Sequence, residues 1–249
     1  MATLVMFGRM IRNMRHAVVI YAVSVLMLGG LIGWAVVTDT GRPNPGLTDR
    51  PALTDVKGHP LTIEATDKEG KLVTKEVPAP ALAGLPVDQS GVGNLEGKEL
   101  RFGKSAGPTW AAMTTVTSNG SVNCMHDSLN PLAGLTPLTG MWLNCIFGGV
   151  GVGLINLLVY LIVGVFLAGL MVGRTPEYLG KKVEAREMKL ASLALLIHPL
   201  MILAPAGMVA ALEWGPASTN NPAAHGFSEI LYEFTSASAN NGSGLSFRP

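Results

Sequence analysis

Two short polar segments of this 249-residue chain could act together in chemistry. Residues 114–123 read TTVTSNGSVN, and residues 235–244 read TSASANNGSG. Both are rich in Thr, Ser and Asn, carry no charge and contain Asn-Gly-Ser, with Gly120 and Gly242 as the shared pivot. Such stretches offer backbone carbonyls and hydroxyls and little else, which is the chemistry of a filter that strips water from a cation. The similar segments therefore indicate ion permeation.

Long charge-free runs surround these segments and predict an integral membrane protein. Residues 17–37 are 21 residues long, enough to cross a hydrocarbon core of about 30 Å. Residues 128–173 contain no charged side chain, and residues 190–212 form a third run. Only 14% of the chain is charged, well below the roughly 25% of soluble domains.

The basic residues gather at two places and predict the orientation in the membrane. Residues 1–16 carry three arginines before the first run, and five cations fill the segment 174–189 between the second and third runs. The positive-inside rule places both on the cytoplasmic side and residues 38–108 outside. Residues 1–16 do not read as a cleavable signal peptide, because the apolar run after them is long and lacks a clear Ala-x-Ala site.

Short elements are expected to position the polar segments. Residues 110–116 are mainly apolar and too short to cross a bilayer, which suits a half-helix that leads into the first polar segment. Residues 226–234 stand in the same place before the second. Irregular backbone at membrane depth must be surrounded by protein or water, so both segments are expected to be re-entrant. Residues 61–77 alternate apolar and polar side chains around a turn, which predicts a β-hairpin outside.

The sequence thus predicts an all-α membrane protein with a small β-containing external loop. The expected segments are a cytoplasmic basic segment (1–16), a transmembrane helix (17–37), an external loop (38–108), a re-entrant pore loop (109–128), a transmembrane helix (141–173), a cytoplasmic loop (174–189), a transmembrane helix (190–212) and a second re-entrant pore loop (226–244), after which the chain is truncated.

The remaining residues that could carry chemistry are better explained by structural roles. Glu229 and Glu233 lie four residues apart, a spacing more typical of helix-face or vestibule carboxylates than of catalysts. Cys124 and Cys145 are interpreted as small apolar fillers. Four glycines within residues 147–153 allow either tight helix packing or a moving gate. We expect no catalytic residue and no metal ligand other than for the permeating cation. The chain has neither a phosphate-binding loop nor an Asp-Lys-Thr-Gly motif, which predicts that it binds no ATP.

Longer motifs resemble one protein family. They are NLEGKELRFG at 94–103, MHDS at 125–128, IFGGVG at 146–151, GLMVGRTPEYLGKK at 169–182, SEILY at 228–232 and NNGS at 240–243. They extend over almost the whole chain and are similar to the channel-like, potassium-binding A subunit of the Kdp potassium-transporting ATPase. The chain corresponds to the second half of such a subunit, with the N-terminal half missing.

The resemblance implies span–pore-loop–span repeats of the potassium-channel and transporter type around a pseudo-fourfold axis. The filter of the third repeat corresponds to Ser118, Asn119, Gly120 and Ser121, and that of the fourth to Asn240, Asn241 and Gly242. These residues are expected to bind a potassium ion, mostly through backbone carbonyls.

The resemblance also implies partners and a location. The expected function is that of a potassium-binding and translocating subunit, in part, of an ATP-driven import complex in the bacterial plasma (inner) membrane. An ATP-hydrolysing B subunit, small accessory subunits and membrane lipid are the expected partners, and nucleic acid is not. The alternatives are a membrane interaction fragment without transport activity, and a passive potassium channel or symporter subunit.

Overall fold

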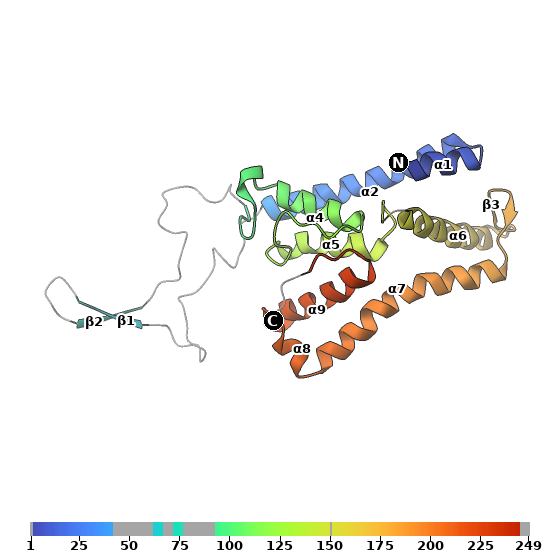
Figure 1. The fold of residues 1–249 in the computed structure, drawn as a ribbon. Coiled ribbons are helices and arrows are strands. Elements are labelled where there is room, and N and C mark those ends of the chain that lie inside the picture. Colours follow the sequence, from blue (N-terminus) through green and yellow to red (C-terminus); the bar gives the residue numbers. More distant parts are fainter. Residues whose placement is uncertain (1, 42–61, 67–71, 77–92, 150, 245–249) are drawn as a thin grey trace.

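The computed structural model describes residues 2–41, 62–66, 72–76, 93–149 and 151–244, and most of them are helical (Figure 1). The helices are α1 (Ala2–Met10), α2 (Met14–Thr40), α4 (Ala106–Val116), α5 (Pro131–Leu143), α6 (Val152–Val172), α7 (Ala185–Ala211), α8 (Trp214–Ala217) and α9 (Ala223–Ser238), with a 3₁₀ turn at Leu100–Phe102.

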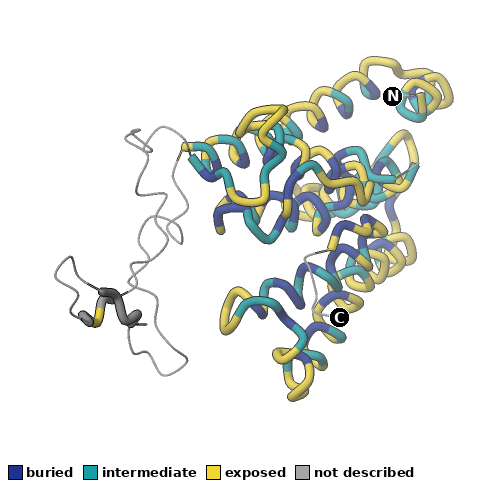
Figure 2. The backbone as a smooth tube through the Cα atoms, turned by 60° about the vertical axis from the view of Figure 1, so that its left-hand side comes forward, coloured by how far each residue is buried: buried dark blue, intermediate teal, exposed yellow. Residues whose placement is uncertain are grey.

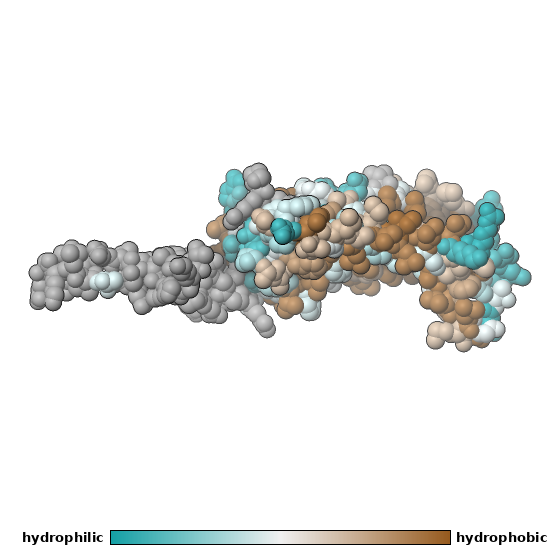
Figure 3. Space-filling model, turned by 90° about the horizontal axis from the view of Figure 1, so that it is seen from below, coloured by the Kyte–Doolittle hydropathy of each residue, from teal (hydrophilic) through white to brown (hydrophobic). Residues whose placement is uncertain are grey.

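Three of these helices, α2, α6 and α7, are long and apolar enough to cross a membrane, with 27, 21 and 27 residues. Much of their surface is exposed, as the yellow stretches in Figure 2 show. Figure 3 shows an apolar surface over the middle of the described part of the chain, with a cluster of hydrophilic residues at the end away from the grey atoms. A mostly helical fold with candidate membrane spans agrees with the sequence prediction. The arrangement of spans and pore loops into repeats remains a prediction.

The second apolar run differs from the single helix expected over residues 141–173. Helix α5 ends at Leu143 and α6 begins only at Val152. Between them Asn144, Gly148 and Gly151 have φ angles of 40°, 57° and 82°, in the left-handed region that interrupts a right-handed helix. The amide of Gly148 donates to the carbonyl of Val116 at 2.7 Å, so this segment completes the C-terminal end of α4.

Two short hairpins accompany the helices. Strands β1 (Thr62–Thr66) and β2 (Leu72–Glu76) pair antiparallel, with Thr62 opposite Glu76, which confirms the predicted hairpin. The other parts of the predicted loop at 42–61, 67–71 and 77–92 lie outside the described residues. Strands β3 (Glu177–Tyr178) and β4 (Lys181–Lys182) form a second hairpin between α6 and α7, which the sequence did not predict.

One end of the molecule brings the two basic segments together. The Nε2 of His16, in the first turn of α2, lies 2.9 Å from the hydroxyl of Tyr178 in β3. This contact holds the arginine-bearing start of the chain beside the connection between α6 and α7, and Figure 1 shows α1 and β3 at the same end. The two cationic segments that the sequence analysis assigned to one side of the membrane are therefore neighbours in space.

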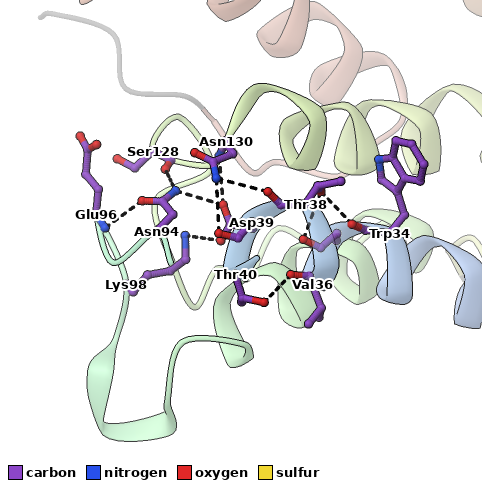
Figure 4. Close-up of polar contacts among 11 residues, drawn as sticks. Trp34, Val36, Thr38, Asp39, Thr40, Asn94, Glu96, Lys98, Ser128 and Asn130 are labelled. Carbon is purple, nitrogen blue, oxygen red and sulfur yellow. Dashed lines mark hydrogen bonds and ion pairs between the residues drawn. The ribbon is translucent and has the colours of Figure 1, made fainter. Parts of the chain in front are cut away.

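A buried ion pair organises the opposite end of α2 (Figure 4). The Nζ of Lys98 lies 2.8 Å from Oδ2 of Asp39, and neither side chain is exposed. Oδ1 of Asp39 accepts hydrogen bonds from Asn94 Nδ2 and from the amide of Asn130, both at 3.0 Å. The cluster joins the end of α2 to the segment before α4 and to the N-terminus of α5, where Pro131 at the first helical position suits the helix start.

The core that carries the polar segments lies between α2 and α7. Helix α4 packs against α2 and α5, while α9 packs against α5 and α7. Small buried residues allow this close packing, such as Ala111 of α4 against Ala133 of α5. Both cysteines are free and buried, as expected. The packing places the C-terminal ends of α4 and α9 side by side.

Candidate functional site

The two polar segments begin with the same backbone turn but differ at their glycines, because Gly242 has a φ of 85° whereas Gly120 lies outside the left-handed region. Each segment begins where a helix ends, at Val116 in α4 and at Ser238 in α9. Two residues beyond each helix the chain takes a left-handed conformation, with φ of 50° at Ser118 and 55° at Asn240. The next amide then reaches back across the turn, from Asn119 to the carbonyl of Thr114 at 3.0 Å and from Asn241 to that of Ser236 at 2.9 Å. The similarity seen in the sequence therefore extends to the first turn of each segment in the structure.

The asparagine side chains close the same turn in both segments. Oδ1 of Asn119 accepts a hydrogen bond from the amide of Ser121 at 2.9 Å, and Oδ1 of Asn241 accepts one from the amide of Ser243 at 3.0 Å. Asparagine bonds its own backbone two residues on in this way, which stabilises a tight turn without a charge. The shared Asn-Gly-Ser triplet thus builds the turn.

An aromatic side chain supports each turn from its helix. Nε1 of Trp110 donates to Oγ of Ser121 at 3.2 Å, and the hydroxyl of Tyr232 lies 3.0 Å from Oγ of Ser243. The Tyr232 hydroxyl also contacts Nδ1 of His126 at 2.6 Å, beyond the first polar segment. This aromatic pair was not predicted from the sequence, although Trp110 and Tyr232 stand at the same distance before Gly120 and Gly242.

The two segments meet backbone to backbone. A Cβ placed on Gly120 would lie 2.6 Å from the carbonyl oxygen of Asn241 and 3.0 Å from the carbonyl carbon of Gly242, so only glycine fits. Nδ2 of Asn241 donates to the carbonyls of Thr114 at 3.0 Å and Asn119 at 3.1 Å. Residues far apart in the sequence therefore form one continuous polar surface.

The electrostatics of this surface suit a cation. Helices α4 and α9 both end at it, and a helix C-terminus carries partial negative charge. None of the seven predicted site residues is charged. Within the described part of the chain, the carbonyl oxygens of Gly120, Asn241 and Gly242 accept no hydrogen bond.

A cavity of about 790 Å³ lies against both segments. Its polar lining includes Ser118, Asn119 and Gly120 of the first segment and Asn240 of the second. Ile20, Leu154 and Leu157 of the spanning helices contribute apolar side chains to its wall. An ion in contact with the polar segments would therefore face a space large enough for several water molecules.

A further contact ties the first segment to the break between α5 and α6. The hydroxyl of Ser118 donates to Oδ1 of Asn144 at 2.9 Å, and the carbonyl of Asn144 accepts a hydrogen bond from Nδ2 of Asn156 at 2.8 Å. Asn144 caps α5 in a left-handed conformation, a position that favours Asn or Gly. An asparagine inside an otherwise apolar run was the signal for this role in the sequence.

All seven predicted site residues lie in the two segments. Asn241 is buried and Ser118 is half-buried, whereas five are exposed, namely Asn119, Gly120, Ser121, Asn240 and Gly242. The structure therefore brings the predicted residues together around the contact between Gly120 and Asn241.

The carboxylate of Glu229 is held by backbone amides of the segment before α9. Glu229 is buried, and its carboxylate accepts hydrogen bonds from the amides of Asn220 at 2.8 Å and Asn221 at 3.0 Å. Asp127, His225 and Glu229 offer ligand atoms within 4.8 Å of one another, but Asp127 already bonds His225 at 2.8 Å. These contacts fix the segment before α9.

Comparisons with known proteins agree with the resemblance. A family model described as "Potassium-transporting ATPase A subunit" matches residues 1–247. Relatives named "Potassium-transporting ATPase potassium-binding subunit" include one from Methylococcus capsulatus, 58% identical over 165 residues, which cover 66% of this chain and 28% of the relative. One from Pseudomonas aeruginosa is 56% identical over 168 residues, covering 67% and 29%. One from Clostridium acetobutylicum is 52% identical over 166 residues, covering 67% and 30%. The matched region therefore spans less than a third of each relative.

Proposed function

The chain belongs to the family of potassium-transporting ATPase A subunits, and from this membership we propose that it forms part of a subunit that binds and translocates potassium in an ATP-driven import complex. The observation that carries the proposal is the meeting of two equivalent, uncharged polar loops at the ends of two helices. Carbonyl oxygens in such loops can replace the hydration shell of a dehydrated cation.

In this proposal the two loops are two parts of one selectivity filter. Residues 118–121 and 240–242 line the ion path, mainly through backbone carbonyls, and α4 and α9 act as the pore helices. The partial negative charge at the C-termini of both helices adds to the attraction for a cation. Filters of this kind are rings, and the relatives are more than three times as long as the matched region. The remainder of the ring therefore comes from the rest of the complete subunit.

The proposed orientation places the filter toward the outside of the bacterial inner membrane. The contact between His16 and Tyr178 supports it, because it gathers both basic segments at one end, as the positive-inside rule requires of a cytoplasmic face. The cluster around Asp39 lies at the opposite end of α2, where ions would enter. The hairpin of β1 and β2 belongs to the external loop.

ATP hydrolysis is proposed to reside in another subunit. The chain contains no phosphate-binding loop and no Asp-Lys-Thr-Gly motif, and the polar residues of its two loops are neutral groups suited to ion coordination. The proposed partners are an ATP-hydrolysing B subunit and small accessory subunits. The present chain contributes the ion path and no catalytic residue.

The proposal is tested in the assembled complex that contains the complete A subunit. Gly242 has a φ of 85°, which a branched side chain rarely adopts. The change Gly242→Val is expected to weaken the potassium dependence of ATP hydrolysis and growth at limiting potassium. Gly164→Ala in α6 is the matched control, because nothing lies within 4 Å of a Cβ there. An unchanged potassium dependence in Gly242→Val would remove this loop from the ion path.

A further inference from the structure

Asn241 uses its whole side chain at the contact between the loops. Its Oδ1 closes the turn of its own loop, while its Nδ2 donates to two carbonyls of the other loop, those of Thr114 and Asn119. The residue is only 5% exposed, so these hydrogen bonds are shielded from water. A short, rigid side chain with both ends engaged fixes the distance between the segments that it joins.

Asn119, the equivalent residue in the first loop, has only one end of its side chain hydrogen-bonded within the described part of the chain. Oδ1 of Asn119 closes its turn in the same way, but among the described residues its Nδ2 has no hydrogen-bond partner, and the residue is exposed. The aromatic residues that support the two loops differ in exposure in the same way. Trp110 is 41% exposed where its counterpart Tyr232 is 2% exposed.

We infer that Asn241 is a positioning residue that sets the separation of the two polar loops, and that Asn119 has the same role toward a further polar loop of the complete subunit. The inference deepens the proposed function and rests on it. Beyond the backbone carbonyl that Asn241 offers to the ion, its side chain acts as a spacer between neighbouring parts of the filter. Through this spacing it influences ion selectivity.

The geometry of the contact between Asn241 and the first loop explains why a similar contact should recur elsewhere in the filter. The amide of the second loop meets the carbonyls of the first, so the contact joins two different surfaces, and contacts of this head-to-tail type continue around a ring until it closes. The exposed polar face of the first loop has no stable alternative at membrane depth, because unsatisfied polar groups there cost several kcal/mol each. The expected occupant is a loop that presents carbonyls equivalent to those of Thr114 and Asn119.

The spacer role of Asn241 is tested by changing the length of the side chain in the complete complex. Asn241→Gln keeps the amide but lengthens it by one methylene, and should widen the filter. We expect the preference for potassium over the larger rubidium ion, measured by ion-stimulated ATP hydrolysis, to fall by about tenfold, the effect of one hydrogen bond. Asn241→Ser removes the amide that donates to both carbonyls, replaces it with a shorter hydroxyl, and should lose the preference altogether. An unchanged preference in a folded Asn241→Gln complex would overturn the role.

The role of Asn119 is tested by Asn119→Ser, which keeps an acceptor oxygen for the turn and removes the amide. The complete complex should lose both thermal stability and ion preference, by amounts similar to Asn241→Ser. Asn123→Ser is the control, since within the described residues the side chain of Asn123 makes no hydrogen bond. Wild-type values for both properties in Asn119→Ser would overturn the inference.

Two further outcomes separate the inference from its premise. A loss of stability in Asn119→Ser together with an unchanged ion preference would support the contact between loops and contradict the filter. If the variant instead abolished association between two copies of the A subunit in the purified complex, measured by its mass in detergent, the occupant would be a second copy. That result would overturn the assignment to a loop of the same subunit.

Discussion

Gly120 lies directly against the backbone of Asn241, so closely that a single added methyl group would come within 2.6 Å of the Asn241 carbonyl oxygen. The contact involves main-chain atoms on one side, which cannot turn away as a flexible side chain can. It therefore makes the spacing of the two loops sensitive to the smallest possible substitution. Gly120 is the residue at which the proposed ion path is most easily disturbed.

The change Gly120→Ala should separate the loops and lower the apparent affinity for potassium in the assembled complex by about tenfold or more, since a shift of this size removes at least one hydrogen bond at the contact. The measurement is the potassium dependence of ATP hydrolysis. Gly134→Ala in α5 is the matched control, because a Cβ there meets nothing within 4 Å. Equal affinities for the two variants would refute the role of the contact.

The buried pair of Asp39 and Lys98 should be sensitive to loss of either partner. The change Lys98→Met leaves a buried carboxylate without its counter-charge, which costs about 3–5 kcal/mol of unfolding free energy. Thermal denaturation of the purified complex measures the loss. Arg101→Met is the control, because the Arg101 side chain is 81% exposed beside Glu99 and exposed ion pairs contribute little to stability.

The double change Asp39→Asn with Lys98→Met should recover part of this loss, because it removes the unpaired charge and keeps an acceptor for the amides of Asn94 and Asn130. If the double variant were as unstable as the sum of the single variants, the two side chains would not be coupled, and the ion pair would not be the reason for the loss.

The carboxylate of Glu229 is expected to hold the segment before α9. The change Glu229→Gln replaces one acceptor oxygen with a donor that faces the amide of either Asn220 or Asn221, which should reduce the unfolding free energy by about 1–3 kcal/mol. Glu213→Gln, at an exposed position, should leave it unchanged. A greater effect on ATP hydrolysis than on thermal stability would instead assign Glu229 a functional role.

The proposed orientation can be tested by cysteine labelling in spheroplasts. Phe102 is 66% exposed and lies on the proposed outer side, whereas Lys182 is exposed in the hairpin on the proposed cytoplasmic side. A membrane-impermeant maleimide should react with Phe102→Cys but reach Lys182→Cys only after lysis. The native cysteines are buried and should contribute little background. The reverse labelling pattern would invert the orientation.

The sequence predicted the elements that depend on local composition. Charge-free runs located the three long helices, and the repeated Asn-Gly-Ser located both turns, because these properties act over a few neighbouring residues. The start of α6 was missed: the apolar run continues through residues 144–151, while the left-handed conformations of Asn144 and Gly151 interrupt the helix. Hydropathy carries no signal for such a break.

The contacts between distant residues could not be predicted from one sequence. The pairing of Asp39 with Lys98 depends on how a long loop returns to α2, and loop closure of this kind leaves no local pattern. The contact of Asn241 with Asn119 depends on the packing of α4, α5 and α9. The repeat in the sequence indicated two similar loops, but only the structure placed them against each other.

The central claim is that the loops at Gly120 and Asn241 hold one potassium ion between them. Thallium is a heavy analogue of potassium, and its anomalous scattering in crystals of the complete complex locates bound monovalent ions directly. We expect a peak bounded by the carbonyl oxygens of residues 118–120 and 240–242 that disappears when excess potassium is added. A peak elsewhere in the subunit, with none between the two loops, would contradict it.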